Sequence, residues 1–191
     1  MMPRILAFAG SLRRDSFNKK LVPIAAKGAR EAGAEVTLID LKDFPLPVFD
    51  QDLEAEHGMP ENGKKLKQLF IDHGGLLLAC PEYNSSVTAV LKNAIDWVSR
   101  PAASEPSLVA FRGKVATLMS ASPGALGGLR GLVHVRSILG NIGVIVLPDQ
   151  LAVPKANEAF EADGSLKDPQ QQAGIEGLGH MLASFLMKLE G

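Results

Sequence analysis

The sequence predicts an α/β protein built on a doubly wound, five-stranded parallel sheet with helices on both faces. Short apolar runs alternate along the chain with stretches in which apolar residues recur at helical spacing. The first of these runs, Arg4–Ala9, lacks the alternation of a half-exposed strand, as expected for a strand that is covered on both faces. A chain of 191 residues is long enough to bury a large core, so we expect one domain over residues 1–191.

Five apolar runs are the candidate strands. The second is introduced by the helix-ending Gly33, and the third lies between a Gly-Gly pair and Pro81. The third run is too short to span a membrane and long enough for a buried strand. In chain order the predicted strands are Arg4–Ala9, Glu35–Asp40, Leu76–Cys80, Lys114–Ser120 and Val144–Leu147.

Five helices are predicted between and after these strands. Ser16 is a good N-cap for the first helix, and Asp168 followed by Pro169 opens the last. The third helix has a wide apolar face, because Ile95 and Trp97 flank its main stripe. The apolar stripes run from Leu21 to Ala29, over Glu61–His73, from Val87 to Val98, over Leu129–Leu139, and from Ile175 to Leu189.

Prolines mark three places where regular structure is not expected. Pro23 falls inside the first helix and indicates a kink or an early irregular turn. Three prolines favour an irregular segment over Leu41–Asn62, whose length is typical of a functional or interface loop. Residues Pro148–Asp168 are also expected to be irregular, with a turn at Asp163-Gly164.

Composition excludes several classes of function. The hydrophobic content of 46% and charged content of 21% are ordinary, and a net charge of −1 argues against a nucleic-acid partner. The single cysteine, Cys80, allows no internal disulfide or CxxC site, and it ends an apolar run like a buried small hydrophobe. The four histidines show no metal-ligand spacing, so no metal site is expected. We find no signal peptide or membrane span, and we expect a cytoplasmic protein without a membrane partner.

The loop after the first strand has the residues of an anion site. Basic residues cluster at the start of the first helix, although helix N-termini favour acidic groups. Main-chain N–H groups, the hydroxyls of Ser11 and Ser16, the amide of Asn18 and the guanidinium of Arg13 would together suit a phosphate. The alternative is an ordinary N-cap followed by solvated basic residues. Neither GxxxxGK[ST] nor GxGxxG is present, so this is not a P-loop or a dinucleotide fingerprint.

Two further loops are unusual. Residues 82–86 supply a carboxylate, a phenol, an amide and two hydroxyls, and residues 120–128 are rich in serine and glycine. Glycines allow a flat ligand to approach the backbone, although a flexible turn before a helix explains the same residues. In the strand order 2-1-3-4-5 all three loops follow neighbouring strands at the switch point, where open α/β sheets bind ligands. The first loop suits a phosphate, the second suits the edge of a heteroaromatic ring, and the third suits the face of that ring. Together these are the parts of FMN.

The motifs GSLRRDSFN, PEYN followed by LKNAIDWVSR, and SASPGALGG resemble those of the NAD(P)H-dependent FMN reductase family. The resemblance covers nearly the whole chain, and it implies a flavodoxin-like fold. By position, it implies that five residues hold the FMN phosphate, four line the ring largely through main-chain groups, and three approach the ring from the other side. These are Ser11, Arg13, Ser16, Phe17 and Asn18; Pro81, Glu82, Tyr83 and Asn84; and Ser122, Gly124 and Gly127.

The resemblance also implies the chemistry. Hydride passes from NADPH or NADH to flavin N5, and the acceptor is then a quinone, chromate, an azo dye or free flavin. No protein nucleophile is required, since the cofactor performs the reaction. Two roles are considered for Glu82: a proton donor, or a carboxylate that is solvated or lies at a dimer contact. Two roles are likewise considered for Tyr83, which could stack on the substrate or pack against a second subunit.

Two family features bear on this chain in particular. Many members have Pro-Gly where this chain has Thr88-Ala89, which predicts a change at the start of the helix and no loss of flavin. The apolar face with Trp97 indicates a partner helix, and in the family that helix packs in a homodimer, often within a tetramer. A flavodoxin-type electron carrier and a flavin-free binding module on the same fold are the alternatives, although near-neutral charge disfavours the acidic carrier.

Overall fold

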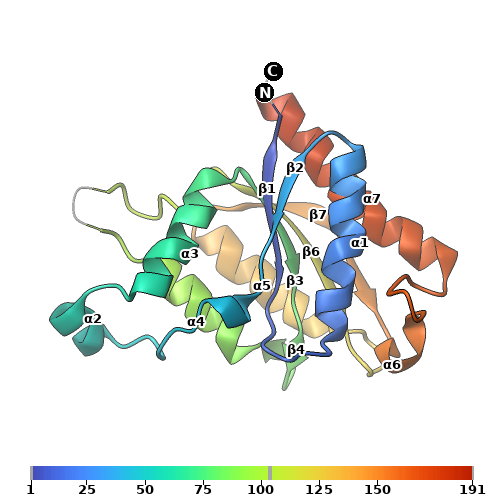
Figure 1. Cartoon of the computed structure of the whole chain (residues 1–191), viewed down its shortest axis with the longest axis horizontal. Helices are drawn as coiled ribbons and strands as arrows, with labels where there is room; N and C mark the ends of the chain where they lie inside the picture. Colours follow the sequence, from blue (N-terminus) through green and yellow to red (C-terminus); the bar gives the residue numbers. More distant parts are fainter. Residues whose placement is uncertain (1, 103–104, 191) are drawn as a thin grey trace.

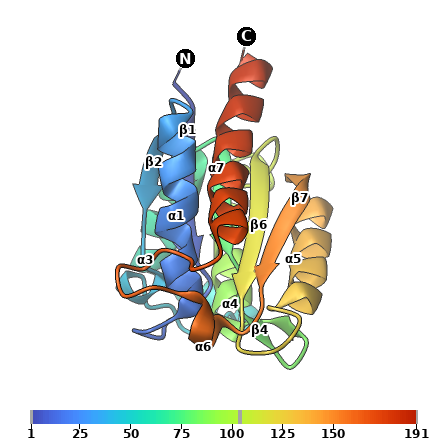
Figure 2. The same ribbon diagram turned by 90° about the vertical axis from the view of Figure 1, so that its right-hand side faces the viewer.

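The computed structural model describes residues 2–102 and 105–190. Its centre is a parallel sheet of five strands in the order β2-β1-β3-β6-β7, which is the predicted order 2-1-3-4-5. Helices α1 and α7 cover one face of the sheet, and α3, α4 and α5 cover the other (Figures 1 and 2). The bounds are β1 Arg4–Ala9, β2 Glu35–Leu38, β3 Gly75–Ala79, β6 Val115–Ala121 and β7 Ile145–Val153, and α1 Phe17–Glu31, α3 Glu61–Asp72, α4 Ala89–Val98, α5 Leu129–Asn141 and α7 Pro169–Glu190.

Alternate side chains of each central strand enter two separate cores. In β1, Ile5 and Ala7 pack under α1 and α7, whereas Leu6 and Phe8 pack under the other three helices. Helices α1 and α7 approach each other closely: a Cβ atom on Gly28 would lie 2.0 Å from the Glu176 carbonyl oxygen, which only glycine tolerates. Strands β1, β3 and β6 pair in parallel, so their carboxyl ends lie side by side at one edge of the sheet.

Three expectations based on proline were wrong in part. Helix α1 runs without interruption through Pro23, so the irregular turn is absent. The segment 41–62 contains a 3-10 turn, η1 (Leu41–Asp43), which precedes its prolines, and a short helix, α2 (Gln51–His57), which lies between Pro47 and Pro60. Strand β7 continues through Pro148 to Val153, because the register between β6 and β7 shifts between Ala116 and Leu118 and the proline falls in that irregularity. The short helix α6 (Ala156–Ala159) follows.

The apolar face of α4 is covered by the chain itself. Trp97 is fully buried, its indole Nε1–H donates to the Pro47 carbonyl at 2.8 Å, and Phe49 packs edge-on against it at 5.0 Å between ring centroids. The expectation that this face requires a partner helix was therefore wrong, because the segment that follows β2 folds back over it. Among the described residues, no helix has the length and apolarity needed to cross a membrane.

Candidate active site

Three loops at the carboxyl edge of the sheet form a small cleft of about 60 Å³. We call it the three-loop cleft. Nine of the twelve residues predicted from the sequence line it, together with two that were not predicted. The nine are Ser11, Arg13, Ser16, Phe17, Asn18, Pro81, Glu82, Tyr83 and Ser122, and the additional two are Ala121 and Pro123. Pro123 belongs to the SASPG stretch, so its place in that motif was the available signal for it.

The start of α1 presents unpaired donors to this cleft. Ser16 is the N-cap residue and is buried, yet its hydroxyl makes no capping hydrogen bond. The first turn of α1 has no acidic residue, and the guanidinium of Arg13 has no hydrogen bond or ion pair with any residue that the structure describes. The Ser11 hydroxyl accepts the Arg13 N–H at 3.2 Å, which shapes the loop. The free N–H groups, the hydroxyl and the guanidinium are the kinds of donor that bind an anion at a helix N-terminus.

Other polar groups near this helix are already paired. The side-chain amide of Asn18 donates to the Ala121 carbonyl at 2.8 Å and accepts from the Ala121 N–H at 3.1 Å, so this side chain ties the start of α1 to the end of β6. Lys19 forms an ion pair with Asp40 at 2.6 Å. The Lys20 ammonium lies over the ring of Phe160 at 5.4 Å. Arg13 is therefore the cation that lines the cleft.

The polar loop after β3 is a β-hairpin. Strands β4 (Glu82–Tyr83) and β5 (Ser86–Val87) pair in antiparallel fashion. Asn84 and Ser85 form the turn with φ of +49° and +64°, as in the two-residue type I′ turn that asparagine favours. Asn84 lies at the tip of this hairpin and does not line the three-loop cleft. A ligand that reaches Asn84 must therefore extend beyond the cleft.

The carboxylate of Glu82 fixes the hairpin to the N-terminus of α5. It accepts hydrogen bonds from the Gly131 N–H at 2.9 Å and from the Arg130 guanidinium at 2.8 Å. Burial by itself raises the pKa of Glu82, but these hydrogen bonds outweigh burial and hold the pKa below its ordinary value. Glu82 is consequently ionised at neutral pH and acts as an anchor that carries no proton to donate.

Thr88 joins two of the loops at their base. Its buried hydroxyl donates to the Gly10 carbonyl at 2.7 Å and accepts the Leu91 N–H at 3.4 Å, which caps α4. Gly10 also packs directly on α4, because a Cβ atom there would lie 2.9 Å from the Leu91 Cβ. The sequence predicted a change at the start of this helix, where Thr88-Ala89 replaces Pro-Gly. In the structure, Thr88 caps α4 and links the first loop to the second.

The glycine-rich loop after β6 is shaped largely by contacts within the protein. Gly127 has a φ of +62°, and a Cβ atom there would lie 2.6 Å from the carbonyl carbon of Val153. Gly128, with a φ of +94°, packs against the Ser120 side chain. Gly124 faces open space apart from the Ser122 hydroxyl. Close approach to a ligand is therefore available at Gly124, whereas Gly127 is used to pack the loop on β7.

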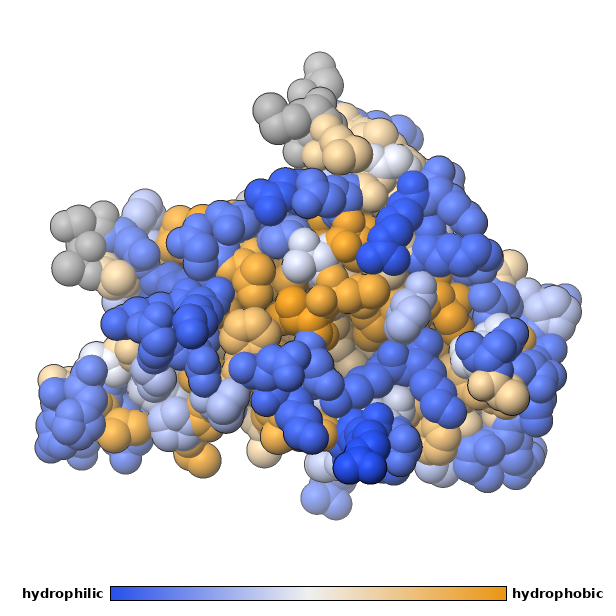
Figure 3. Space-filling view, viewed as in Figure 1, coloured by the Kyte–Doolittle hydropathy of each residue, from blue (hydrophilic) through white to orange (hydrophobic). Residues whose placement is uncertain are grey.

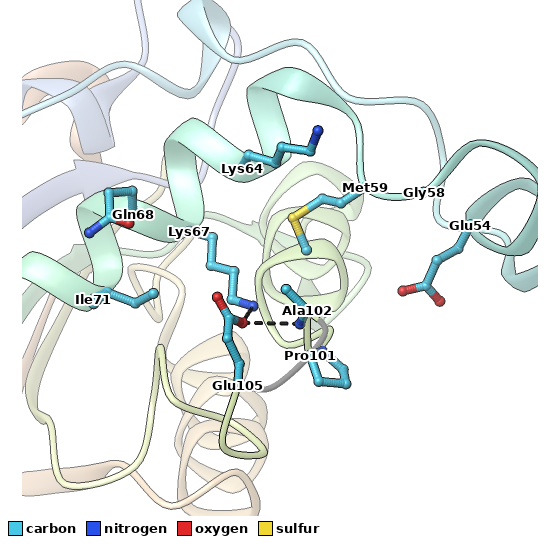
Figure 4. Close-up of a pocket in the computed structure, with 10 residues that line it drawn as sticks. All are labelled: Glu54, Gly58, Met59, Lys64, Lys67, Gln68, Ile71, Pro101, Ala102 and Glu105. Carbon is cyan, nitrogen blue, oxygen red and sulfur yellow. Dashed lines mark hydrogen bonds and ion pairs between the residues drawn. The ribbon is translucent and has the colours of Figure 1, made fainter.

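A larger cavity of about 500 Å³ lies between α3, the end of α2 with the residues that follow it, and the residues Pro101, Ala102 and Glu105 (Figure 4). Its buried cation, Lys67, pairs with Glu105 and donates to the Arg100 carbonyl at 2.7 Å. Arg100 Nε in turn pairs with Glu54 at 2.9 Å. These charges satisfy one another and hold α2 and α3 to the segment after α4. None of the predicted site residues lines this cavity.

The thiol of Cys80 is unsuited to chemistry. It is fully buried, and burial raises its pKa to about 12, so it stays protonated at neutral pH. The described residues contain no cluster of three or more His, Cys, Asp or Glu side chains that could hold a metal ion.

The cleft fits the phosphate end of a nucleotide better than a whole ligand. Its volume of about 60 Å³ is well below the roughly 300–1,000 Å³ of sites that enclose a drug-sized molecule. The donors at the start of α1 suit a phosphate, and Tyr83, which is 54% exposed, also lines the cleft. The residues present therefore fit the phosphate group of FMN.

Comparison with known proteins shows the family to which this chain belongs. A family model described as NADPH-dependent FMN reductase matches residues 3–158. The chain is 34% identical to a probable NADPH:quinone oxidoreductase of rice over 98% of this chain and 91% of that protein. It is 33% identical to an NAD(P)H-dependent FMN reductase of Pseudomonas aeruginosa, over 98% and 97% of the two chains. The structure matches a flavoenzyme NAD(P)H:(acceptor) oxidoreductase of Paracoccus denitrificans with a TM-score of 0.79 and 28% identity, over 98% of both chains.

Proposed function

This chain belongs to the NADPH-dependent FMN reductase family, and we propose that it uses NAD(P)H to reduce quinones over an FMN held at the three-loop cleft. The observation that carries the proposal is the convergence of three loops, distant in sequence, on a cleft with the donors for one phosphate. The names of the rice protein and of a quinone reductase of Escherichia coli, which is 33% identical over 95% of this chain and 93% of that protein, support the choice of acceptor.

In this proposal the phosphate is held at the start of α1. The hydroxyls of Ser11 and Ser16, the Arg13 guanidinium and the main-chain N–H groups of Phe17 and Asn18 are its donors. The unused cap hydroxyl of Ser16 and the unpaired guanidinium of Arg13 support this assignment. Hydrogen bonds between charged partners are stronger than neutral ones, so these groups supply much of the affinity for the cofactor.

The ring environment is assigned to the other two loops. The main chain of Pro81, Glu82, Tyr83 and Asn84 is assigned to the ring edge, and Ser122 and Gly124 are assigned to the other side. Gly127 is not assigned to the ring, because it packs this loop on β7. The anchored carboxylate of Glu82 keeps the hairpin in one position, which preorganises those main-chain groups. When bound, FMN supplies the two-electron chemistry between NAD(P)H and the acceptor. The exposed ring of Tyr83 offers a surface on which a flat acceptor stacks.

An anaerobic spectrum of the purified protein with added FMN tests this function. We expect a bound-flavin spectrum that bleaches with NADPH and returns when 1,4-benzoquinone is added. A bound flavin that stays oxidised with both NADPH and NADH would identify an electron carrier. No flavin binding would leave only a binding module on this fold, and the proposal would fail.

We further propose that the protein acts in the cytoplasm as one domain over residues 1–191, and that it assembles as a homodimer, with a tetramer as the larger form. Exposed apolar side chains beside the open side of the cleft, Tyr83, Leu126, Leu129 and Val133, support a contact with a second copy. Leu129 is the first residue of α5, where aspartate suits the helix terminus. Sedimentation equilibrium should find a smaller species for Leu129→Asp than for the unmodified protein. A monomer at all concentrations of the unmodified protein would contradict the assembly.

A further inference from the structure

The start of α1 is held by contacts with distant segments in place of the usual cap. Within the described residues the hydroxyl of Ser16 makes no capping hydrogen bond, and the first turn has no acidic residue. Helix ends fray when their N–H groups lack such partners. The first two residues of the helix instead make long-range contacts: Asn18 bonds to Ala121, and Phe17 packs on Phe160. The order of this terminus in the free protein therefore depends on those contacts.

Phe160 follows the short helix α6 and reaches the start of α1 from a distant part of the sequence. The rings of Phe17 and Phe160 lie nearly parallel, at 7°, with their centroids 6.1 Å apart. The Lys20 ammonium lies over the same ring of Phe160 at 5.4 Å. Phe17 lines the three-loop cleft, whereas Phe160 does not. Phe160 thus supports the first residue of α1 from outside the cleft.

The other end of this segment holds the loop after β6. We call residues 154–160 the α6 segment. The N–H of Lys155 donates to the Gly124 carbonyl at 3.3 Å, and the N–H of Ala156 donates to the Ser122 carbonyl at 3.1 Å. Lys155 has a φ of +47°, a left-handed conformation that is uncommon for residues other than glycine. The α6 segment therefore joins two of the three loops of the cleft, one at each of its ends.

The outward side of the α6 segment is polar. Lys155, Asn157 and Glu158 are exposed, whereas Ala156 is buried and Phe160 packs on the core beneath α1. Figure 2 places α6 beneath the start of α1, and Figure 3 shows mostly hydrophilic side chains at the lower right, where Figure 1 places α6. The polar residues of the segment thus face solvent, and its apolar residues are used within the molecule.

We propose that the α6 segment positions the phosphate site, and that Phe160 is the positioning residue that keeps the Phe17 N–H and the Ser16 hydroxyl in place for the FMN phosphate. The inference rests on the proposed function, because it gives residues outside the cleft a role in binding the same cofactor. Donors that are ordered in advance avoid the loss of freedom that a frayed terminus undergoes on binding. Because riboflavin has no phosphate, the α6 segment raises the preference of the site for FMN over riboflavin.

The Kd values of the apoprotein for FMN and for riboflavin, measured by flavin fluorescence, test the proposal. Phe160→Ala should raise the Kd for FMN roughly 5- to 30-fold, which corresponds to ordering about one residue, and leave the Kd for riboflavin unchanged. Phe160→Leu keeps more of the apolar volume and should show a smaller rise, so it serves if the alanine variant does not fold. Phe160→Tyr keeps the ring and should restore the Kd for FMN.

The matched control is Phe49→Ala. Phe49 is also a partly buried ring, packed on Trp97 at 5.0 Å between centroids, and it does not line the three-loop cleft. This variant should lose stability in urea and leave the ratio of the two Kd values unchanged.

Substitutions at Lys155 test the other end of the segment. Lys155→Pro removes the N–H and cannot adopt a φ of +47°, so it should raise the Kd for FMN as well. Lys155→Gly keeps the N–H and adopts this φ readily, so it should bind FMN like the unmodified protein. A rise in Kd for the glycine variant would show that the lysine side chain itself is used, and it would overturn the main-chain role.

The remaining outcomes separate this inference from the proposed function. If the unmodified protein binds FMN and Phe160→Ala leaves both Kd values unchanged, or raises both by one factor, the inference is overturned and the proposed function stands. An equal change of the Kd ratio in Phe49→Ala would also overturn it, because any loss of stability would then suffice. If the unmodified protein binds no flavin, the proposed function fails and the inference fails with it.

Discussion

Removal of the Thr88 hydroxyl should weaken both folding and FMN binding. In Thr88→Val the buried Gly10 carbonyl loses its 2.7 Å hydrogen bond, and α4 loses its cap. An unsatisfied buried carbonyl costs about 1–3 kcal/mol, and a lost N-cap costs about 0.5–2 kcal/mol. A decrease of about 3 kcal/mol in the free energy of unfolding is expected, which lowers Tm by about 6–12 °C in a chain of this size.

Thr88→Val should also weaken FMN binding, because the first loop loses the hydrogen bond that holds Gly10 to Thr88. If one residue of the first loop becomes disordered in the free protein, FMN binding must restore its order at a cost of about 1–2 kcal/mol. The Kd for FMN should therefore rise roughly 5- to 30-fold. Fluorescence titration of flavin with the apoprotein measures this Kd, and urea unfolding measures stability. Thr88→Ser keeps the hydroxyl and should restore both values.

The matched control is Thr37→Val. Thr37 also loses a side-chain hydrogen bond, to His73 at 2.7 Å, but it does not line the three-loop cleft. This variant should lose stability while its Kd for FMN stays unchanged. The reasoning is refuted if Thr88→Val leaves the Kd unchanged, or if both variants raise it equally.

Three further predictions concern single side chains. Arg13→Ala should weaken FMN binding by about 1.5–3 kcal/mol through lost charge-assisted contacts, roughly 10- to 150-fold in Kd, whereas Arg14→Ala should not; equal effects would place the phosphate elsewhere. Because the pKa of Glu82 is lowered in the folded state, its carboxylate adds stability that is fully present above its unfolded pKa and is lost as pH falls through its folded pKa. Urea unfolding should therefore show Glu82→Gln destabilised at pH 7 and nearly equal to the unmodified protein well below pH 4, and a pH-independent difference would contradict the anchor. Cys80→Ala should keep kcat unchanged, since the pKa of about 12 leaves the thiol protonated, and a large loss of kcat in a folded variant would show that the thiol takes part.

The sheet and the cleft were predictable because their signals are local. Short apolar segments, and the glycines and prolines that bound them, identified all five strands of the parallel sheet, and the order β2-β1-β3-β6-β7 confirms the predicted topology. The residues of the cleft follow directly after three of these strands. Parallel strands bring their carboxyl ends to one edge, so loops at residues 11, 81 and 122 meet without further information.

Other features depended on contacts between distant segments. Nothing near Trp97 in sequence indicates that Pro47 and Phe49 fold back to cover it. The extension of β7 through Pro148 required a register shift against β6. The commitment of the Asn18 amide to Ala121, 103 residues away, is likewise a product of the tertiary structure. The spacing of apolar residues indicates the secondary structure that one segment favours. These three features depend instead on contacts with segments that are distant in the sequence.

The affinity of the apoprotein for FMN compared with riboflavin tests the central claim most directly. The two ligands differ only in the phosphate that the start of α1 is proposed to hold. Two or more charge-assisted hydrogen bonds at about 1.5–3 kcal/mol each predict that FMN binds at least roughly 100-fold more tightly. The same Kd for both flavins would contradict a phosphate site formed by Ser11, Arg13 and Ser16.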